Sequence, residues 1–287
     1  MEYVLKYDDL EIVVNSKGAE LEKIMYKGKD YMRVRDEYWN RISPILFPIV
    51  GNLKDLKTYI SGELFFIPQH GIARDSEFKL FKRTNNQLIF YLKYNETTLK
   101  TYPYKFMLFV VFRIINKRLQ VRINVVNKGK ENMYFNVGGH PGFRIPLRDD
   151  ESFEDYSVEF EKTETFDAPT VEKNGTLNFD VTDKYKDVDK ISLNYKLFAI
   201  DAIVIPQIKS RWVKLVNKKG KGIKFSFKKF NSLAIWSRPN APFVCLEPWQ
   251  GYADRYDSNY DFLTKDDLVR LRKEESYTCE YNIEILD

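Results

Sequence analysis

Short runs of alternating apolar and polar residues, separated by turn residues, dominate this chain and predict β-strands. Residues 119–125 alternate cleanly, and residues 277–285 place Tyr277, Cys279, Tyr281 and Ile283 on one side. Asp8-Asp9 and Asn85-Asn86 are typical turn dipeptides. The expected strands are two within 3–14, then 18–26, 58–60, 64–67, 78–81, 88–94, 106–115, 119–125, 133–137, 156–160, 191–195, 212–216, 223–227, 233–236, 243–246 and 277–285.

Four stretches depart from simple alternation. Residues 42–51 are apolar but contain two prolines, which predicts a buried extended segment and not a central strand. Residues 106–115 are apolar on nearly both faces, which predicts a strand buried between two layers. Residues 145–190 are polar and predict irregular structure around the strand at 156–160. The one expected helix is 265–271, after a possible cap at Thr264.

The length and composition favour an all-β fold. The 287 residues are 44% hydrophobic and 15% aromatic, and aromatic residues favour strands. Many short strands at regular spacing predict a sandwich or barrel. Because all-β domains reach this length as one unit, and no linker or repeat interrupts the sequence, we expect a single domain spanning residues 1–287.

The charges of both signs are interspersed along the chain. A net charge of +5 from 46 basic and 41 acidic residues indicates a solvated surface, so nucleic acid is not an expected partner. The two cysteines, Cys245 and Cys279, form no disulfide framework. The first residues lack the apolar core of a signal peptide, and no apolar run reaches ~20 residues, so a cytoplasmic protein without membrane contact is expected.

Residues 243–251 contain the first candidate for chemistry. If Val244 and Leu246 face one side of this strand, Cys245 and Glu247 face the other. Glu247 then ends a buried run, where Pro248 limits further ladder bonds and desolvation raises its pKa. Trp249 adds a flat apolar face. A carboxylate beside an indole suits a sugar, although an exposed strand-end Glu beside a core Trp would give the same pattern.

The only two histidines, His70 and His140, share one context. Each follows an expected strand and lies beside glycine, so each is expected to be poorly buried and free to face a cleft. Loop histidines that cap nearby backbone are the alternative. Two imidazoles and one carboxylate suffice to shuttle protons between hydroxyl groups near neutral pH.

Other chemistries have weaker support in the sequence. His70, His140 and Glu247 could together ligate a metal, as in a metal hydrolase, but the spacing of a zincin helix is absent. The chain has no G-x-S-x-G nucleophile elbow, no phosphate-binding P-loop and no dinucleotide fingerprint. Acid–base catalysis remains the best-supported chemistry.

Four stretches, taken together and in order, resemble the aldose 1-epimerase (galactose mutarotase) family, most closely its LacX-like branch. They are Pro44-Ile45-Leu46-Phe47-Pro48-Ile49-Val50-Gly51, Pro68-Gln69-His70-Gly71-Ile72-Ala73-Arg74-Asp75, Asn136-Val137-Gly138-Gly139-His140-Pro141-Gly142-Phe143 and Leu246-Glu247-Pro248-Trp249. The resemblance implies a single-domain β-sandwich of the galactose mutarotase-like supersandwich type, with a sugar cleft on the concave face of one large sheet.

The resemblance also implies the roles of individual residues. Glu247 would be the general base and His140 the general acid, kept protonated by a nearby carboxylate, while His70 would bind and polarise the sugar. Arg74 and Asp201 would bind hydroxyl groups. The implied reaction interconverts the α and β anomers of a hexose by opening and closing the ring, and it requires no metal or organic cofactor.

One departure from the family concerns the substrate. The family commonly has Gly-Arg after the proline-rich segment, whereas this chain has Gly51-Asn52, and Asn52 offers a hydrogen bond without a charged fork. A hexose-6-phosphate mutarotase and a non-catalytic sugar-binding or sensing protein of the same fold therefore stay open. The expected partner is a small sugar, and the expected assembly is a monomer or homodimer.

Overall fold

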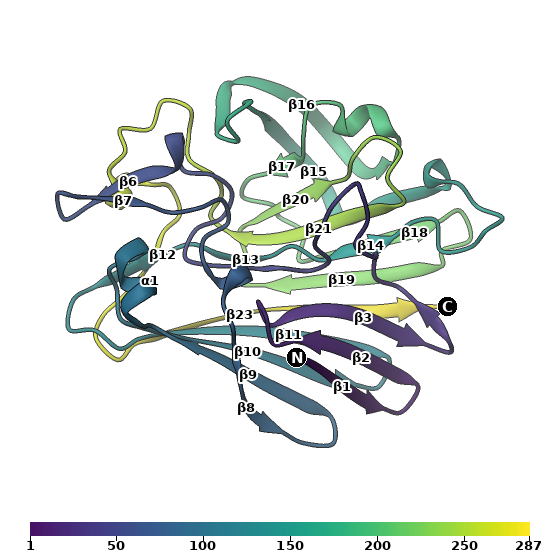
Figure 1. Cartoon of the computed structure of the whole chain (residues 1–287). Coiled ribbons are helices and arrows are strands. Elements are labelled where there is room, and N and C mark those ends of the chain that lie inside the picture. The colour runs from purple at the N-terminus through teal and green to yellow at the C-terminus, as the bar shows by residue number, and fades with distance from the viewer.

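The computed structural model describes residues 1–287 and is built almost wholly from β-strands (Figure 1). The largest sheet has nine strands in the order β16-β15-β18-β19-β23-β11-β10-β9-β8. Its strands are β8 (Lys79–Arg83), β9 (Gln87–Lys93), β10 (Phe106–Ile115), β11 (Arg118–Asn127), β15 (Tyr156–Val171), β16 (Leu177–Ser192), β18 (Trp212–Asn217), β19 (Gly222–Lys228) and β23 (Ser276–Leu286).

Two smaller sheets cover one face of the nine-stranded sheet. The six-stranded sheet contains β5 (Ile45–Leu46), β13 (Val137–Gly139), β14 (Gly142–Arg144), β17 (Ile203–Ile205), β20 (Ser232–Trp236) and β21 (Phe243–Gln250). The four-stranded sheet contains β1 (Glu2–Tyr7), β2 (Leu10–Asn15), β3 (Glu20–Tyr26) and β4 (Lys29–Asp30).

Short ribbons and helical turns complete the fold. The two-stranded ribbons pair β6 (Lys57–Ile60) with β7 (Glu63–Phe66) and β12 (Met133–Phe135) with β22 (Val269–Leu271). The helices are α1 (Glu96–Thr101) and five 3₁₀ turns, Lys54–Leu56, Ala73–Asp75, Phe153–Asp155, Tyr195–Phe198 and Phe262–Thr264. None of the helices is long and apolar enough to cross a membrane.

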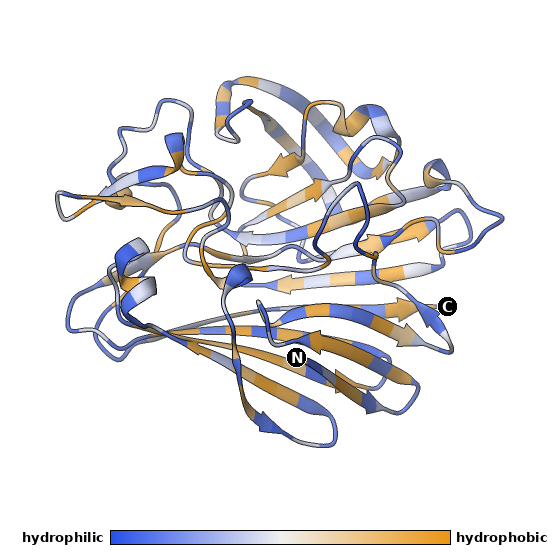
Figure 2. Ribbon diagram, viewed as in Figure 1, coloured by the Kyte–Doolittle hydropathy of each residue, from blue (hydrophilic) through white to orange (hydrophobic).

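The layers are held together by a core of 67 buried residues. The rings of Phe143 on β14 and Phe225 on β19 lie 5.9 Å apart, and those of Tyr3 on β1 and Phe90 on β9 lie 5.2 Å apart. Both small sheets therefore pack on the large one, which makes the molecule a sandwich. In Figure 2 the strands of β1–β3 and β9–β10 are mostly orange, whereas β15 and β16 are banded with blue.

Strand β10 corrects one expectation. Its residues alternate between fully buried and half-exposed, so only one face is covered, although both faces are apolar. The wholly buried strand is instead β21, in which seven of eight residues are buried. Val244 and Leu246 face the main core, while Phe243 and Cys245 belong to a separate cluster, as the alternation predicts.

The polar stretch 145–190 is not irregular as expected. It forms most of β15 and β16, two 16-residue strands that pair through several register shifts. Bulges interrupt the two-residue period, and β16 is an edge strand that is largely exposed. No buried face imposes a hydrophobic pattern on it, so alternation cannot reveal it.

The helix expected at 265–271 is also wrong. A 3₁₀ turn at Phe262–Thr264 precedes β22 at Val269–Leu271, and Asp267 between them has a φ of 55°, which ends helical geometry. The α-helix is α1, where Asn95 and Thr98 form a reciprocal capping box. The pair Asn95…Thr98 was the sequence signal for this helix.

The proline-rich segment 42–51 is buried and extended, as expected, and contributes only the short edge strand β5. The carbonyl of Phe47 accepts hydrogen bonds from the N–H groups of Ile72 and Ala73. Gly71 makes this approach possible, because its φ is +77° and a Cβ atom there would lie 2.2 Å from the Phe47 carbonyl oxygen.

We predict that Gly71→Ala lowers the free energy of unfolding by about 3 kcal/mol or more, since it combines left-handed strain with backbone overlap. Gly62→Ala is the matched control: its φ is +83°, but its Cβ would meet nothing within 4 Å. The control should lose only about 1–2 kcal/mol. Urea unfolding measures both, and equal losses would show that the Phe47 contact does not matter.

Candidate active site

The strand pairing around β21 brings the two main candidates together. Gly138 of β13 pairs with Trp249, and Gly142 of β14 pairs with Cys245. The same register continues across the break between β13 and β14, so His140 lies directly opposite Glu247. Opposed side chains of neighbouring strands have Cβ atoms ~5 Å apart, which is contact distance for an imidazole and a carboxylate.

Pro248 does not end the strand as expected. Strand β21 continues to Gln250, and Pro248 pairs with Leu233 of β20. On the other edge, the neighbouring strand is interrupted at His140-Pro141, between β13 and β14. A residue that lacks an N–H donor is tolerated beside this break.

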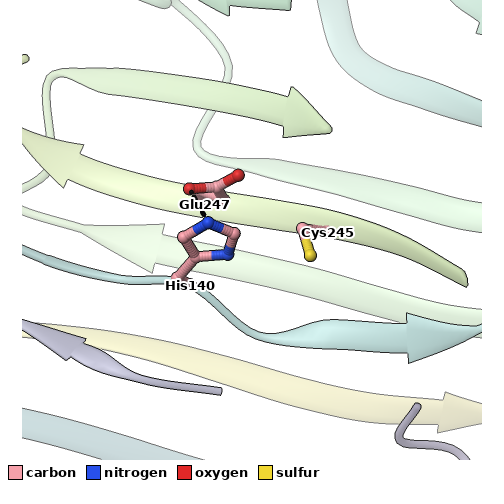
Figure 3. Close-up of side chains that lie close together, drawn as sticks. All are labelled: His140, Cys245 and Glu247. Carbon is pink, nitrogen blue, oxygen red and sulfur yellow. Dashed lines mark ion pairs between the residues drawn. The ribbon is translucent and has the colours of Figure 1, made fainter. Parts of the chain in front are cut away.

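His140 and Glu247 form a buried pair. The His140 Nε2 and Glu247 Oε2 atoms lie 3.0 Å apart, and Figure 3 shows the imidazole directed at the carboxylate. Burial raises the pKa of Glu247 well above its ordinary 4.5, and the neighbouring Asp201 raises it further. Burial lowers the pKa of His140 to about 3, with Arg74 acting in the same direction. Both shifts favour the neutral form of the pair, in which Glu247 carries the proton.

One expectation about the histidines is corrected. His70 is 7% exposed and His140 is 6% exposed, so neither is poorly buried. Burial, and after it the positive charge of Arg74, lowers the pKa of His140 and so opposes the protonated form that the resemblance implied. Burial likewise lowers the pKa of His70 well below 6.5.

The peptide of Gly51 fixes the orientation of His70. The His70 N–H donates to the Gly51 carbonyl at 2.8 Å, and the Gly51 N–H donates to His70 Nδ1 at 3.1 Å. Nδ1 is thus an acceptor, so the neutral ring carries its proton on Nε2. His70 has a φ of 61°, a conformation that non-glycine residues rarely adopt. The His70 and His140 rings meet edge to face at 5.4 Å.

A cavity of about 190 Å³ opens over the pair, on the face of β21 turned away from the nine-stranded sheet. The adjoining ends of β15 and β16, which belong to the nine-stranded sheet, contribute Val171 and Leu177 to its wall, so both sheets take part in the cavity. The structure brings together most of the candidate residues in its wall. The lining comprises Trp39, Gly51, Gln69, His70, Arg74, His140, Val171, Gly175, Leu177, Asp201, Ala202, Val204, Trp236, Arg238, Glu247, Trp249 and Ala253.

Asn52 is the one candidate outside that lining. Its Nδ2 donates to the carbonyl of Asn174 at 2.7 Å. A Cβ on Gly175 would lie 2.2 Å from the same Nδ2 atom, so Asn52 is packed tightly against the turn between β15 and β16. The side chain holds this turn, whose Gly175 lines the cavity.

Arg74 and Asp201 approach the cavity from different segments. The Arg74 side chain is mostly buried, its Nε has no hydrogen-bond partner in the chain, and burial lowers its pKa to about 10, so it stays charged near neutral pH. Asp201 accepts a hydrogen bond from the N–H of Ala202 at 2.7 Å. Trp249 is buried beneath His70, with ring centroids 6.5 Å apart.

Among the lining residues that sequence reasoning missed are two tryptophans and an arginine. Trp39 packs on the His140 ring with centroids 4.6 Å apart, and Trp236 meets it edge-on at 5.6 Å. The guanidinium of Arg238 lies 5.8 Å from the Trp236 ring. The scarcity of tryptophan was the available signal, because three of the four tryptophans line this one cavity.

The residues that could hold a metal differ from those expected. Cys245, and not His70, joins His140 and Glu247, and their ligand atoms lie within 4.8 Å of one another (Figure 3). Burial raises the pKa of the Cys245 thiol well above 9, with the Glu247 carboxylate adding to the effect. Since metals bind the thiolate, a metal at this site would have to displace the Cys245 proton.

Comparisons with known proteins identify the family and the fold. The sequence profile of the Aldose 1-epimerase family matches residues 1–284. Protein LacX of Lactococcus lactis subsp. lactis, plasmid form, is 34% identical over 99% of both chains. A galactose mutarotase related enzyme from Lactobacillus acidophilus is 29% identical, with a TM-score of 0.94 over 100% of this chain and 98% of that one.

A galactose mutarotase-like protein from Lactobacillus casei superposes with a TM-score of 0.90 at 23% identity, and each chain is covered completely. The all-β architecture is therefore that of galactose mutarotase-like proteins. With a family profile spanning nearly the whole sequence and a curated relative of equal length, this chain belongs to the aldose 1-epimerase family.

Proposed function

We propose that this protein is a mutarotase that interconverts the α and β anomers of a hexose. The observation that carries the proposal is the buried His140–Glu247 pair, with 3.0 Å between Nε2 and Oε2, on the wall of a cavity sized for a small molecule. Family membership supports an epimerase of this type. The cavity also combines tryptophan faces with polar groups, as sugar sites require.

The reaction needs one proton acceptor and one proton donor. The acceptor takes the proton of the anomeric hydroxyl while the donor protonates the ring oxygen, and the C1–O5 bond breaks to give the open aldehyde. After rotation about C1–C2, O5 attacks the other face of the carbonyl. Both protons then return, so the enzyme regains its starting state.

The pair supplies both functions with a single proton between its members. In the resting state Glu247 holds that proton and His140 is neutral, so Glu247 can donate and His140 can accept. The assignment implied by the family, with Glu247 as base and His140 as acid, requires the proton to cross the 3.0 Å contact when sugar binds. The two groups titrate as a unit, and each serves in one half of the cycle.

The other lining groups have supporting roles. Neutral His70 presents its Nε2–H to the cavity, because Nδ1 is occupied by Gly51, and it can polarise the anomeric or ring oxygen. Asp201 can accept a hydrogen bond from a hydroxyl group, and Trp249 can pack on the C–H face of the ring.

A hexose 6-phosphate is the second candidate substrate. Both Arg74 and Arg238 line the cavity, and a buried arginine with a free donor suits a phosphate oxygen. Polarimetry with freshly dissolved α-glucose, α-galactose and α-glucose 6-phosphate distinguishes these substrates. Quenching of tryptophan fluorescence by sugar, without faster mutarotation, would indicate a protein that binds sugar and does not catalyse.

We predict that Glu247→Gln lowers kcat for mutarotation by at least about 100-fold, because an amide can neither carry nor accept the proton. Glu164→Gln is the control, since Glu164 is equally buried but accepts the Ser210 N–H outside the cavity. The control should keep wild-type kcat. Wild-type turnover in folded Glu247→Gln protein would remove this residue from the mechanism.

The raised pKa of Glu247 also predicts a pH-dependent difference in stability. Its contribution is fully present below the unfolded value near 4.5 and is lost as pH rises toward the folded value. Glu247→Gln has no such loss. From pH 4 to pH 7 the variant should therefore gain stability relative to wild type, by up to about 1.4 kcal/mol per pH unit.

Urea unfolding of both proteins at several pH values measures that difference. His140 acts in the opposite sense, because its contribution is present above pH 6.5 and is lost as pH falls toward about 3. This second effect acts in both proteins, so the difference between them reports the removal of the Glu247 proton together with its coupling to His140. A difference that stays constant between pH 4 and 7 would contradict the burial of an ionisable Glu247.

Chelation tests the alternative use of the His140–Cys245–Glu247 cluster. We expect EDTA to leave mutarotation unchanged, because the proposed steps move only protons between Glu247, His140 and the sugar. Initial rates before and after dialysis against EDTA provide the measurement. Activity that disappears and returns with one divalent ion would favour a metal-dependent reaction.

A further inference from the structure

We propose that Arg33 is a positioning residue that shapes segment 33–41 so that Trp39 covers the His140 ring. Arg33 is 2% exposed and does not line the cavity, so it can act on the site only through its neighbours. The kinetic part of this inference rests on the mutarotase function proposed above, whereas its structural part does not.

Segment 33–41 contains no helix or strand, so no regular backbone hydrogen bonds set its shape. Hydrogen bonds from the Arg33 guanidinium hold it instead. One of its nitrogens, Nη1, donates to the carbonyls of Trp39 and Arg41, and Nη2 bonds the Asp36 carboxylate. The same Asp36 oxygen accepts the backbone N–H groups of Tyr38, at 3.0 Å, and Trp39, at 3.1 Å. The planar fork of arginine thus fixes both ends of the turn that presents Trp39.

The backbone and the guanidinium of Arg33 are also held in place. The backbone N–H donates to the Gly142 carbonyl at 3.0 Å. The guanidinium lies 4.3 Å from the Phe243 ring and 5.2 Å from the Trp39 ring. A Cβ on Gly142 would lie 2.7 Å from the Arg33 Cδ atom, so only glycine at this position lets the side chain pass. Gly142 is the first residue of β14 and follows His140 by two residues, so Arg33 contacts the chain directly beside the β13–β14 break.

Trp39 is the residue of segment 33–41 that connects Arg33 to the cavity. Its ring packs on His140 at 4.6 Å with an interplanar angle of 32°, and it contacts Trp236 edge-on at 5.3 Å. Trp39 and Trp236 both contact the imidazole, with ring centroids 4.6 and 5.6 Å from it. This cover excludes water from His140, favours its neutral form and holds Nε2 toward Glu247.

The charged and titratable groups around His140 enter any pH measurement. They are Glu247 and Cys245 on β21, His70, Arg74 and Arg41 on the segments beside it, and Arg33 itself. Arg33 thus disfavours a protonated His140 by charge as well as through Trp39. Arg33→Lys separates the two effects, because lysine keeps the charge but cannot reproduce the planar fork.

The experiment follows the titration of His140 by NMR in apo protein. The chain has only two histidines, so His140→Asn assigns the signals without ambiguity. We expect no His140 inflection between pH 5 and 8 in the wild type. Arg33→Met, Arg33→Lys and Trp39→Leu should each bring the His140 inflection into this pH range, whereas Trp39→Phe, which keeps a ring over His140, should resemble the wild type.

Arg211→Met is the matched control, because Arg211 also donates to two backbone carbonyls, those of Phe230 and Ile208, but lies outside the cavity. It should leave the titration unchanged. A wild-type His140 titration in both Arg33→Lys and Trp39→Leu would overturn the proposal. A shift in Arg33→Met that is absent in Arg33→Lys would overturn it as well, since charge alone would then explain the effect.

Kinetics supply an independent test. Arg33→Lys should lower kcat about tenfold or more with KM changed less than about threefold, and adding it to Trp39→Leu should cause little further loss, because coupled residues are not additive. Additive losses would overturn the proposal that Arg33 acts through Trp39. If the wild type shows no mutarotation, the proposed function fails, and the titration still decides the positioning role.

Discussion

The structure around the site depends on one cross-strand register. Because β13 and β14 flank β21 in the same register with a break between them, His140 stands opposite Glu247 at the interruption. In a continuous strand, the backbone of residue 140 would instead form regular ladder hydrogen bonds with β21. The break frees the His140 side chain to reach the carboxylate, and it also accommodates Pro248. The His140–Glu247 pair is thus a consequence of sheet geometry.

Burial then sets the proton chemistry. Glu247 lies on β21, which is buried on both faces, and His140 lies opposite it at the β13–β14 break; burial disfavours charge on each. The result is a neutral pair with one proton. A mutarotase needs this kind of site, because the two halves of its cycle require the same two groups in opposite protonation states.

The surrounding segments hold the cavity wall without regular structure. Gly51 fixes His70 through two hydrogen bonds, Asn52 holds the β15–β16 turn, and Arg33 organises the loop that carries Trp39. In each case side-chain hydrogen bonds take the place of a backbone ladder. Arg33 Nε and Asn52 Oδ1 have no partner within the chain, so the bonds that the other atoms of these side chains make are the ones that favour this arrangement of the wall.

The sequence by itself determined the strand content and most of the site. Alternation located the strands whose one face is buried, and the glycine-flanked histidines and Glu247 stood out because their residue types and contexts are rare. Alternation failed for β16, which buries no face, and a local cap signal was missed for α1. The tertiary structure alone decided that His140 faces Glu247, that both histidines are buried and neutral, and that Asn52 lies behind the cavity wall. The tertiary structure also revealed that Trp39 lines the cavity and that Arg33 holds its loop. Register, burial and long-range contacts depend on segments that are far apart in sequence, so local patterns do not reveal them.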